Sequence, residues 1–311
     1  MAPSLDIIIV NWNSGNHLRE CLASIVSAEK SRFHLARVAV VDNASEDGSC
    51  DRLEPSDLPL TLIHNTENRG FAAACNHGAN GSQADYLLFL NPDTQLFQET
   101  LDKPLEFMQR PENGHVGICG VRLIDDFNVT AISCARFPSL KIFFGKMTGL
   151  DRISPRLFPS HILSREECRQ NSEVDQVIGA FFMVRKTLYD SNQGFDERFF
   201  VYFEEVDFAF RAKEKGYSSY YLADVSLYHK GGASSQKVKA KRLFYSLRSR
   251  IQYAFKHFSM LEATVLLLLT LTVELGARML HGLTTSPMAT IGETLGGYSM
   301  LILFFIRKGW K

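Results

Sequence analysis

Short, almost purely apolar runs alternate with segments of helical periodicity in the first third of the chain. The runs are 5–10, 37–43, 60–65 and 85–93, and the helical segments that follow them are 14–28, 45–53, 69–80 and 97–109. Continuous Val, Ile and Leu are typical of parallel strands covered on both faces, and strand–helix alternation indicates β-α-β units. The pattern predicts an α/β fold with a Rossmann-like, mostly parallel sheet flanked by helices.

Polar residues follow each of these runs. Ligands of open α/β sheets bind in the crevice outside the carboxyl ends of the strands. Strand ends can also be polar simply because the loops that follow them are solvated. Four successive strand ends rich in Asp and Asn, however, favour a shared polar cleft. The residues concerned are Asn11, Asn13, Asp42, Asn43, Asn68, Asn91 and Asp93.

The middle of the chain is less regular. Segments 114–124, 174–186 and 217–232 have the composition of further strands, whereas 125–172 is mixed, with scattered Pro and Arg. We expect this mixed segment to form loops and short helices over the cleft.

The C-terminal part has a different character. Aromatic and aliphatic residues recur at steps of three and four from Phe244 to Phe258, and residues 236–261 hold seven basic residues and no acidic one. This is the pattern of a basic amphipathic helix that lies on anionic lipid.

Two apolar stretches, 263–273 and 294–306, come next. Each is shorter than the ~20 residues of a spanning helix, so we expect helices embedded in one leaflet or packed at its surface. A true membrane span, and a soluble helical hairpin that buries a homo-oligomer interface, are the alternatives. The chain therefore divides into a first domain, 1–235, and a helical, membrane-associating extension, 236–311.

Composition adds a few bounds. The chain has 311 residues and a formal net charge of +0, so a whole-molecule attraction to nucleic acid is not indicated. Its six cysteines form no C-x-x-C pair, which predicts reduced thiols in a cytosolic chain. The N-terminus has no basic segment before its apolar run and is expected to be a strand, not a signal peptide.

Asp93 and His229 are candidate metal ligands. Pro92 ends a strand and presents Asp93 at the sheet edge, where a carboxylate can hold Mg²⁺ or Mn²⁺ whose other ligands come from phosphate. His229 ends a later strand before Gly-Gly, and its neutral imidazole could be a further ligand. An Asx turn at Asp93 and a structural His229 are the plain alternatives.

Two further segments could hold a nucleotide. Asp42 and Asn43 come directly after a buried strand, a position suited to hydrogen bonding with a nucleoside. Arg69 could face a phosphate, and Gly70 with the small residues after it would let a ligand approach the backbone. Ser45 could instead cap a helix, and this is not a Walker loop because no G-K-[ST] follows.

Three acids stand among aromatics in the segment 199–211. On a helix, Asp207 and Arg211 lie four apart and can pair. One of Glu204 and Glu205 can then point into the cleft, where burial and a second acid would raise its proton affinity and suit it to general-base work. An acid-rich helix start favoured by the helix dipole is the alternative.

The order of these segments resembles one protein family. In sequence they read "IIIVNWNS", "VVDNASEDGS", "NRGFAAACNHG", "LFLNPD", "GAFFMVRK", "GFDERFFVYFEEVDFAFR" and "YHKGG". Together, over about residues 4–235, they resemble the family 2 glycosyltransferases with the GT-A fold, most of all the rhamnosyltransferase-like branch of bacterial polysaccharide assembly. The resemblance implies transfer of a sugar from a nucleoside diphosphate to an acceptor hydroxyl, with inversion.

The resemblance also implies roles for particular residues. Asp42 matches the acid that contacts the nucleotide base, and Asp93 is the retained carboxylate of an Asp-x-Asp metal motif that here begins with Asn91. Glu205 matches the base, the second member of a Glu-Asp pair, with Glu in place of Asp, so Glu204 stays a candidate. His229 matches a metal-binding His of some relatives.

The expected enzyme moves rhamnose from dTDP-rhamnose onto a lipid-linked saccharide for O-antigen or cell-wall polysaccharide, at the cytoplasmic face of a bacterial inner membrane. A hexosyltransferase that uses a UDP-sugar is the alternative within the same class. The others are an inactive nucleotide-sugar-binding subunit and a nucleotidyltransferase, whose usual Gly-rich, Lys-containing first loop is missing here.

Overall fold

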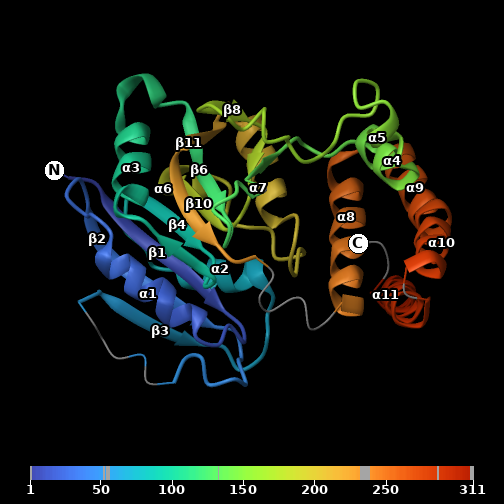
Figure 1. Cartoon of the computed structure of the whole chain (residues 1–311). Coiled ribbons are helices and arrows are strands. Elements are labelled where there is room, and N and C mark those ends of the chain that lie inside the picture. Colours follow the sequence, from blue (N-terminus) through green and yellow to red (C-terminus); the bar gives the residue numbers. More distant parts are fainter. Residues whose placement is uncertain are drawn as a thin grey trace. The chain divides into compact units, whose positions relative to one another are not determined.

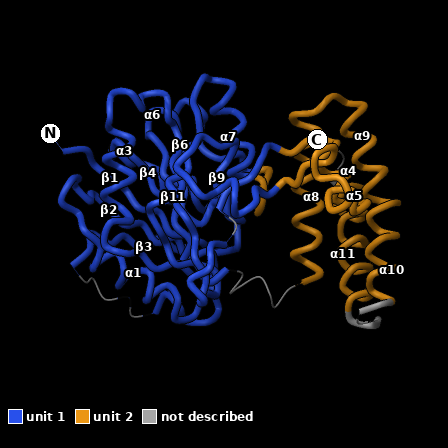
Figure 2. Tube along the Cα trace, turned by 45° about the horizontal axis from the view of Figure 1, so that its top comes forward, with its two compact units in different colours: residues 1–137, 162–197, 204–234 blue, residues 138–161, 198–203, 235–311 orange. Residues whose placement is uncertain are grey.

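The computed structural model describes residues 2–51, 53, 57–131, 133–231, 239–285 and 287–308. It has two compact units (Figure 2): unit 1 is 1–137, 162–197 and 204–234, and unit 2 is 138–161, 198–203 and 235–311. The predicted domain boundary at 235–236 falls outside the described residues. Two internal segments of the predicted first domain belong to unit 2, which the local sequence pattern did not indicate.

Unit 1 is built on a mixed sheet of nine described strands (Figure 1). The strands of the unit are β1 (Ser4–Asn11), β2 (His34–Asp42), β3 (Leu60–His64), β4 (Tyr86–Leu90), β5 (Thr94–Leu96), β6 (Val116–Ile124), β7 (Cys134–Ala135), β8 (Ser172–Val174), β9 (Gln176–Val177), β10 (Phe181–Arg185) and β11 (Ser218–His229). The order is β3-β2-β1-β4-β10-β6-β11-β5, with β8 beside β11, and β7 pairs with β9 separately. Strands β1 to β4 pair in parallel, and β10 runs antiparallel to both of its neighbours.

Alternation along β1 explains its run of apolar residues from Ile7 to Val10. Ile7 and Ile9 face one core cluster, which includes residues of α1, whereas Ile8 and Val10 face the other, which includes residues of α2. The helices of the unit are α1 (His17–Ser27), α2 (Phe71–Ala79), α3 (Asp102–Gln109), α6 (Lys186–Ser191) and α7 (Glu204–Glu214). A strand covered on both faces is mostly apolar, as predicted, and the one buried acid within it, Asp6, pairs with Arg37 at 3.0 Å.

Two predicted helices differ from the structure. The described residues of 45–53 form turns, because Asp47 Oδ1 accepts the Ser49 N–H and Gly48 has a left-handed φ of 69°. Short polar side chains that bond their own backbone compete with helix formation. The segment 97–109 splits into a 3₁₀ turn, Gln98–Thr100, followed by α3.

Unit 2 is helical. Its described helices are α4 (Leu140–Thr148), α5 (Leu150–Ile153), α8 (Lys239–His257), α9 (Met260–Leu269), α10 (Leu275–Thr285) and α11 (Pro287–Lys308), with a π-helical turn, Thr270–Glu274, between α9 and α10. Leu247 and Ile251 of α8 are fully buried in a cluster with Tyr298 and Leu301 of α11. The apolar face of α8 is therefore a core face, which corrects the expectation that it lies on lipid.

The exposed apolar side chains of unit 2 lie on other helices. Those with about half or more of their surface exposed on α9, α10 and α11 are Met260, Leu261, Leu268, Leu280, Leu283, Leu295, Ile302, Leu303 and Ile306. The helical stretch Met260–Leu283 is long and apolar enough to cross a membrane, by length and composition alone. It continues through Glu274, which the apolar pattern treated as a break, because that buried carboxylate pairs with Arg250 and Arg278.

Candidate active site

The carboxyl ends of the parallel strands bring the predicted polar residues to one edge of the sheet. Asn11 ends β1 beside Asp42, the last residue of β2, which in turn pairs with His64 at the end of β3. Strand β11 is parallel to β6, and both run in the direction of β4, so His229 ends at this edge as well. The edge contains candidates from five strands and their following loops.

Asp42 lies within a hydrogen-bonded polar cluster. Its carboxylate accepts from Asn11 Nδ2 at 3.3 Å and from the Ser45 N–H at 3.2 Å, and its other oxygen lies 3.4 Å from His64 Nδ1. Asn13 has a left-handed φ of 51°, and its side chain accepts the Glu46 N–H. The β1–α1 and β2–β3 loops are thereby joined to each other beside Asp42.

Asn43 joins this cluster to the next loop. Its Nδ2 donates to Asn68 Oδ1 at 2.9 Å and to the Gly70 carbonyl at 3.2 Å, and its Oδ1 accepts the Arg69 N–H. The side chain of Arg69 is exposed. Gly70 has a φ of 86° immediately before α2, a conformation that favours glycine. The predicted nucleotide-binding residues of both loops therefore belong to one hydrogen-bonded network, in which Asn11, Asp42 and Asn43 are buried and Arg69 is exposed.

The two predicted metal ligands are adjacent. His229 pairs with Thr94 across β11 and β5, and its Nε2 lies 3.4 Å from Asp93 Oδ1. Burial alone would raise the pKa of the Asp93 carboxyl, but the hydrogen bond and charge of His229, with smaller effects of the Asp93 backbone N–H and of His17, outweigh burial, so the pKa lies below its ordinary value. An ionised carboxylate suits Mg²⁺ or Mn²⁺, and the imidazole beside it is a candidate for a further ligand.

The protein supplies few ligands at this position. Within the described part of the chain, no group of three or more His, Cys, Asp and Glu side chains is arranged to hold a metal. A cation on Asp93 and His229 would need further ligands, and the phosphate oxygens of a bound donor are the ligands that Mg²⁺ ordinarily takes in such sites. The pair therefore fits a metal that binds together with a diphosphate.

His17 is a neighbour of this pair that sequence reasoning missed. It begins α1, and its charge is among the influences that lower the pKa of Asp93. One turn later on the same helix, Cys21 Sγ lies 3.6 Å from Thr94 Oγ1, next to Asp93. A basic residue just after the β1 loop was the available signal, but nothing local indicated which strand end it would face.

Glu205 lies at the same edge of the sheet. Its side chain lies next to Gly179. Ala180, the residue after Gly179, accepts a hydrogen bond from the Asn91 N–H through its carbonyl, which places this segment beside the end of β4. Glu204 is only 5% exposed, whereas Glu205 is partly exposed. Each has one buried carboxylate oxygen, Oε2, without a hydrogen-bond partner among the described residues.

The two acids differ in electrostatic environment. Burial, followed by the charge of Glu205, raises the pKa of Glu204 well above its ordinary value. Burial also raises the pKa of Glu205, but the N–H groups of Glu205 and Val206, at the start of α7, oppose the rise. The partly exposed Glu205 is thus the better placed of the two to ionise and meet a substrate.

Helix α7 is fixed by a buried ion pair, as predicted. Arg211 Nε donates to Asp207 Oδ2 at 2.7 Å, and its other nitrogens donate to the carbonyls of Asn192 and Gly194. Asp207 is fully buried. The chain enters α7 through Tyr202 and Phe203, whose φ angles of 67° and 71° are costly for bulky residues. The pair and the strained entry hold the acids at the start of the helix.

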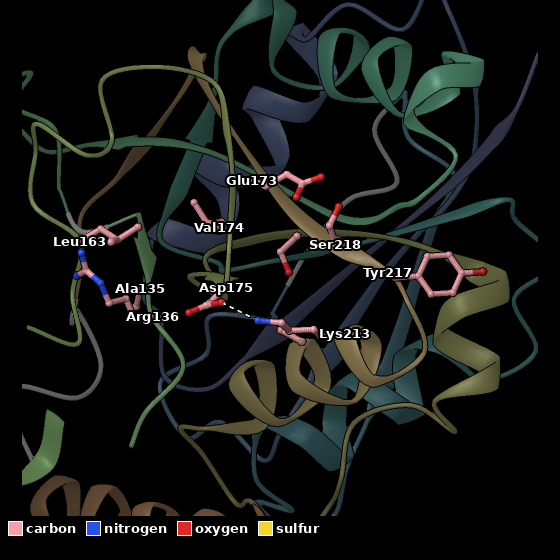
Figure 3. A pocket seen from close by; sticks show the side chains of 11 residues that line it. Ala135, Arg136, Leu163, Glu173, Val174, Asp175, Lys213, Tyr217 and Ser218 are labelled. Atoms are coloured by element: carbon pink, nitrogen blue, oxygen red, sulfur yellow. Dashed lines mark hydrogen bonds and ion pairs between the residues drawn. The ribbon is translucent and has the colours of Figure 1, made fainter. Parts of the chain in front are cut away.

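A cavity of about 350 Å³ lies elsewhere in unit 1 (Figure 3). Lys213 and Asp175, 3.2 Å apart, line it with Ser218. Ser218 begins β11 and His229 ends it, a separation of roughly 35 Å along the strand. This cavity is therefore not part of the candidate active site.

Comparison with known proteins agrees with this geometry. Residues 6–191 match the model of the family described as "Glycosyl transferase family 2". The chain belongs to this family. It is a glycosyltransferase, and the family resemblance seen in the sequence is confirmed.

Two curated relatives are rhamnosyltransferases. The chain is 29% identical over 258 residues, 78% of its own length and 81% of the relative's, to the N-acetylglucosaminyl-diphospho-decaprenol L-rhamnosyltransferase of Mycobacterium tuberculosis. It is 24% identical over 174 residues, 54% of its length and 61% of the relative's, to the rhamnosyltransferase WbbL of Escherichia coli.

Solved structures confirm the GT-A-like fold. A mannosyltransferase of Pyrobaculum calidifontis, in complex with GDP-Man and Mn²⁺, is similar with a TM-score of 0.56 and 16% identity, over 97% of this chain and 88% of that one. TarS residues 1–349 of Staphylococcus aureus, with UDP-GlcNAc, gives a TM-score of 0.55 and 15% identity, over 96% and 80%. At such identities the likeness concerns the fold alone.

Proposed function

We propose that this glycosyltransferase is an inverting, divalent-metal-dependent rhamnosyltransferase that acts on a lipid-linked saccharide. The observation that carries the proposal is the meeting, at one sheet edge, of the Asp93–His229 pair, the Asp42–Asn43 cluster and Glu205. The donor sugar and the acceptor are inferred from the printed activity of the mycobacterial relative.

The cluster around Asp42 and Asn43 would bind the nucleoside, which we take to be thymidine, and Arg69 would face the diphosphate. Asp93 and His229 would hold the divalent cation with the diphosphate. When bound, that cation offsets the negative charge that develops on the leaving phosphate. Asp93 and His229 would thereby keep the leaving group at the carboxyl ends of the strands, on the edge where Asp42 and Asn43 would hold the nucleoside.

Glu205 would act as the base. The acceptor hydroxyl attacks the anomeric carbon from the face opposite the diphosphate; the new C–O bond forms as the bond to the phosphate oxygen breaks, and Glu205 takes the hydroxyl proton. The Glu205 side chain is partly exposed, so a substrate hydroxyl could reach its carboxylate. Glu204, more buried and with its pKa raised further, would remain protonated and leave Glu205 as the ionised member.

Transfer assays test the catalytic roles. With dTDP-rhamnose, Mg²⁺ or Mn²⁺ and a polyprenyl-diphosphate N-acetylglucosamine acceptor, Glu205→Gln should lower kcat by about 10²–10⁴-fold and leave donor binding intact. Glu204→Gln is the matched control and should keep most activity. The opposite outcome for the two variants would reassign the base to Glu204.

A donor screen and a metal test address the remaining parts. Nucleotide release across dTDP-, UDP- and GDP-sugars would show whether a UDP-hexose replaces dTDP-rhamnose, and no release with any donor would indicate an inactive subunit. Asp93→Ala should abolish metal-dependent turnover, and full activity in EDTA would contradict the metal role. Family membership favours glycosyl over nucleotidyl transfer.

The membrane part of the proposal rests on unit 2. We place the protein at the cytoplasmic face of the bacterial inner membrane, peripheral or shallowly embedded, through the exposed apolar side chains of α9, α10 and α11. Exposed Lys239, Lys241 and Arg242 of α8 would add an electrostatic attraction to anionic lipid. Full-length protein should therefore float with anionic vesicles, and more weakly at high salt.

A further inference from the structure

Two buried thiols meet in unit 1. The Sγ atoms of Cys134 and Cys168 lie 2.8 Å apart, while a disulfide bond measures about 2.05 Å, so less than about 1 Å of movement separates them from bonding distance. Cys134 is fully buried in β7, and Cys168 is 6% exposed in the segment before β8. By contrast, the sulfur of Cys21 contacts the Thr94 hydroxyl, and the sulfur of Cys50 accepts from the Asn11 amide.

The backbone brings these two cysteines together. Ala135 forms a β-bridge with Ile162, and the Leu163 N–H donates to the Cys134 carbonyl at 3.3 Å. Arg136 and Glu167 form an ion pair in the same place. The two segments that carry the cysteines are therefore held side by side by the local fold.

The pair marks the base of an insertion. The chain leaves unit 1 after Phe137, contributes residues 138–161 to unit 2, and re-enters unit 1 at Ile162. Cys134 lies just before the exit and Cys168 just after the return. A covalent bond between them would close this insertion into a ring.

We propose that Cys134 and Cys168 are a modification site, a dithiol that small-molecule disulfides oxidise to a cross-link at the base of the insertion. Cys168, the less buried thiol, attacks the small disulfide as a thiolate and forms a mixed disulfide, and one small thiol leaves. The Cys134 sulfur then attacks Cys168 Sγ and displaces the second small thiol. Two S–H bonds break, one S–S bond forms, and the two protons and two electrons end on the two small thiols.

The environment sets the rate of this step. Burial, and then the neighbouring Cys168, raise the pKa of Cys134, which lowers the thiolate fraction of the second attacking group. Oxidation should therefore be slow at neutral pH and faster at pH 8–9. In a reducing cytosol the dithiol form would prevail, as the sequence predicted, and the cross-link would form only under oxidising conditions.

The test uses native, full-length protein. Oxidised glutathione is added, free thiols are blocked with N-ethylmaleimide, and tryptic peptides are analysed without reduction. We expect peptide 123–136 linked to peptide 166–169, with the loss of two hydrogen atoms, and its disappearance after dithiothreitol. A single tryptic nick after Arg152 or Arg156, both exposed, should leave fragments that stay joined on a denaturing gel until reduced.

Two variants complete the experiment. Cys168→Ser should abolish the linked peptide, whereas Cys119→Ser, at another fully buried thiol, should leave its yield unchanged. The proposal is wrong if Cys134 and Cys168 of the oxidised wild type are both still alkylated after unfolding, or if Cys134 is linked equally to other cysteines. The wild-type measurement decides the matter even where a variant folds poorly.

Discussion

Replacing Arg211 tests whether the buried ion pair fixes the helix that carries the acids. Arg211→Met keeps the length and apolar stem of the side chain but removes the partner of Asp207, which is fully buried. It also leaves the Asn192 and Gly194 carbonyls without their donors. Breaking a buried pair by removing one partner costs about 3–5 kcal/mol, a large fraction of the ~5–15 kcal/mol that stabilises a typical domain.

Denaturant unfolding measures this loss. Trp12 lies in unit 1, so its fluorescence, in a Trp310→Phe background that removes the second tryptophan, reports on that unit. Lys213→Met is the matched control: it lies on the same helix and pairs with Asp175, but its side chain is 63% exposed, and such pairs contribute about 0–1 kcal/mol. Equal, small losses for the two variants would refute the role of the buried pair. A double-mutant cycle with Asp207→Asn would then isolate the coupling.

Three further outcomes are expected. Gly194→Ala should destabilise the protein by more than about 2 kcal/mol, because the added Cβ would lie 2.6 Å from Asn76 Oδ1 and the residue has a φ of 72°. Gly216→Ala is the control in the same unfolding assay. Gly216 has a φ of 85° but open space around it, so this variant measures the cost of the backbone conformation alone. The free energy of unfolding of Glu204→Gln should exceed that of the wild type by an amount that grows as the pH rises above about 4.5. The reason is that the pKa of Glu204 is raised in the folded state, so the wild type loses stability as the pH rises over that range. A difference in unfolding free energy that does not depend on pH would contradict this. Leu280→Gln should weaken vesicle flotation, because that side chain is 65% exposed on α10, and unchanged flotation would count against this surface.

Features with a local cause were predicted from the sequence. Apolar runs identified β1, β2 and β4 because a doubly covered strand needs no polar position. The i, i+4 spacing identified the Asp207–Arg211 pair because residues four apart are neighbours on a helix. The strand-end rule then placed Asp42 at the edge of the sheet that also holds Asp93. The roles of these residues stay predictions until variants are assayed.

Features that depend on distant partners were not predicted. The apolar face of α8 looks membrane-active in isolation, and only α11 shows that it is a core face. Glu274 looked like a break in an apolar helix because its partner Arg250 lies in another helix. Residues 138–161 join unit 2 because Phe143 and Met147 pack with Ala263 and Leu266. The spacing of apolar residues along a helix identifies an apolar face but not what covers it.

Our proposal assigns the base to Glu205, where the family resemblance implies the shorter Asp, so the positioning of the longer side chain has to be explained. A longer side chain costs more entropy to hold in one rotamer and would weaken positioning if it were free. Here it starts in the first turn of α7, where the N–H groups of Glu205 and Val206 stabilise its charged form. Burial raises the pKa of Glu204 well above its ordinary value, whereas Glu205 is partly exposed, so burial separates the environments of two chemically identical acids. A shift of the acid limb of the kcat/KM profile to lower pH in Glu204→Gln would show residual charge on Glu204, whereas an unchanged limb would show that the separation is complete.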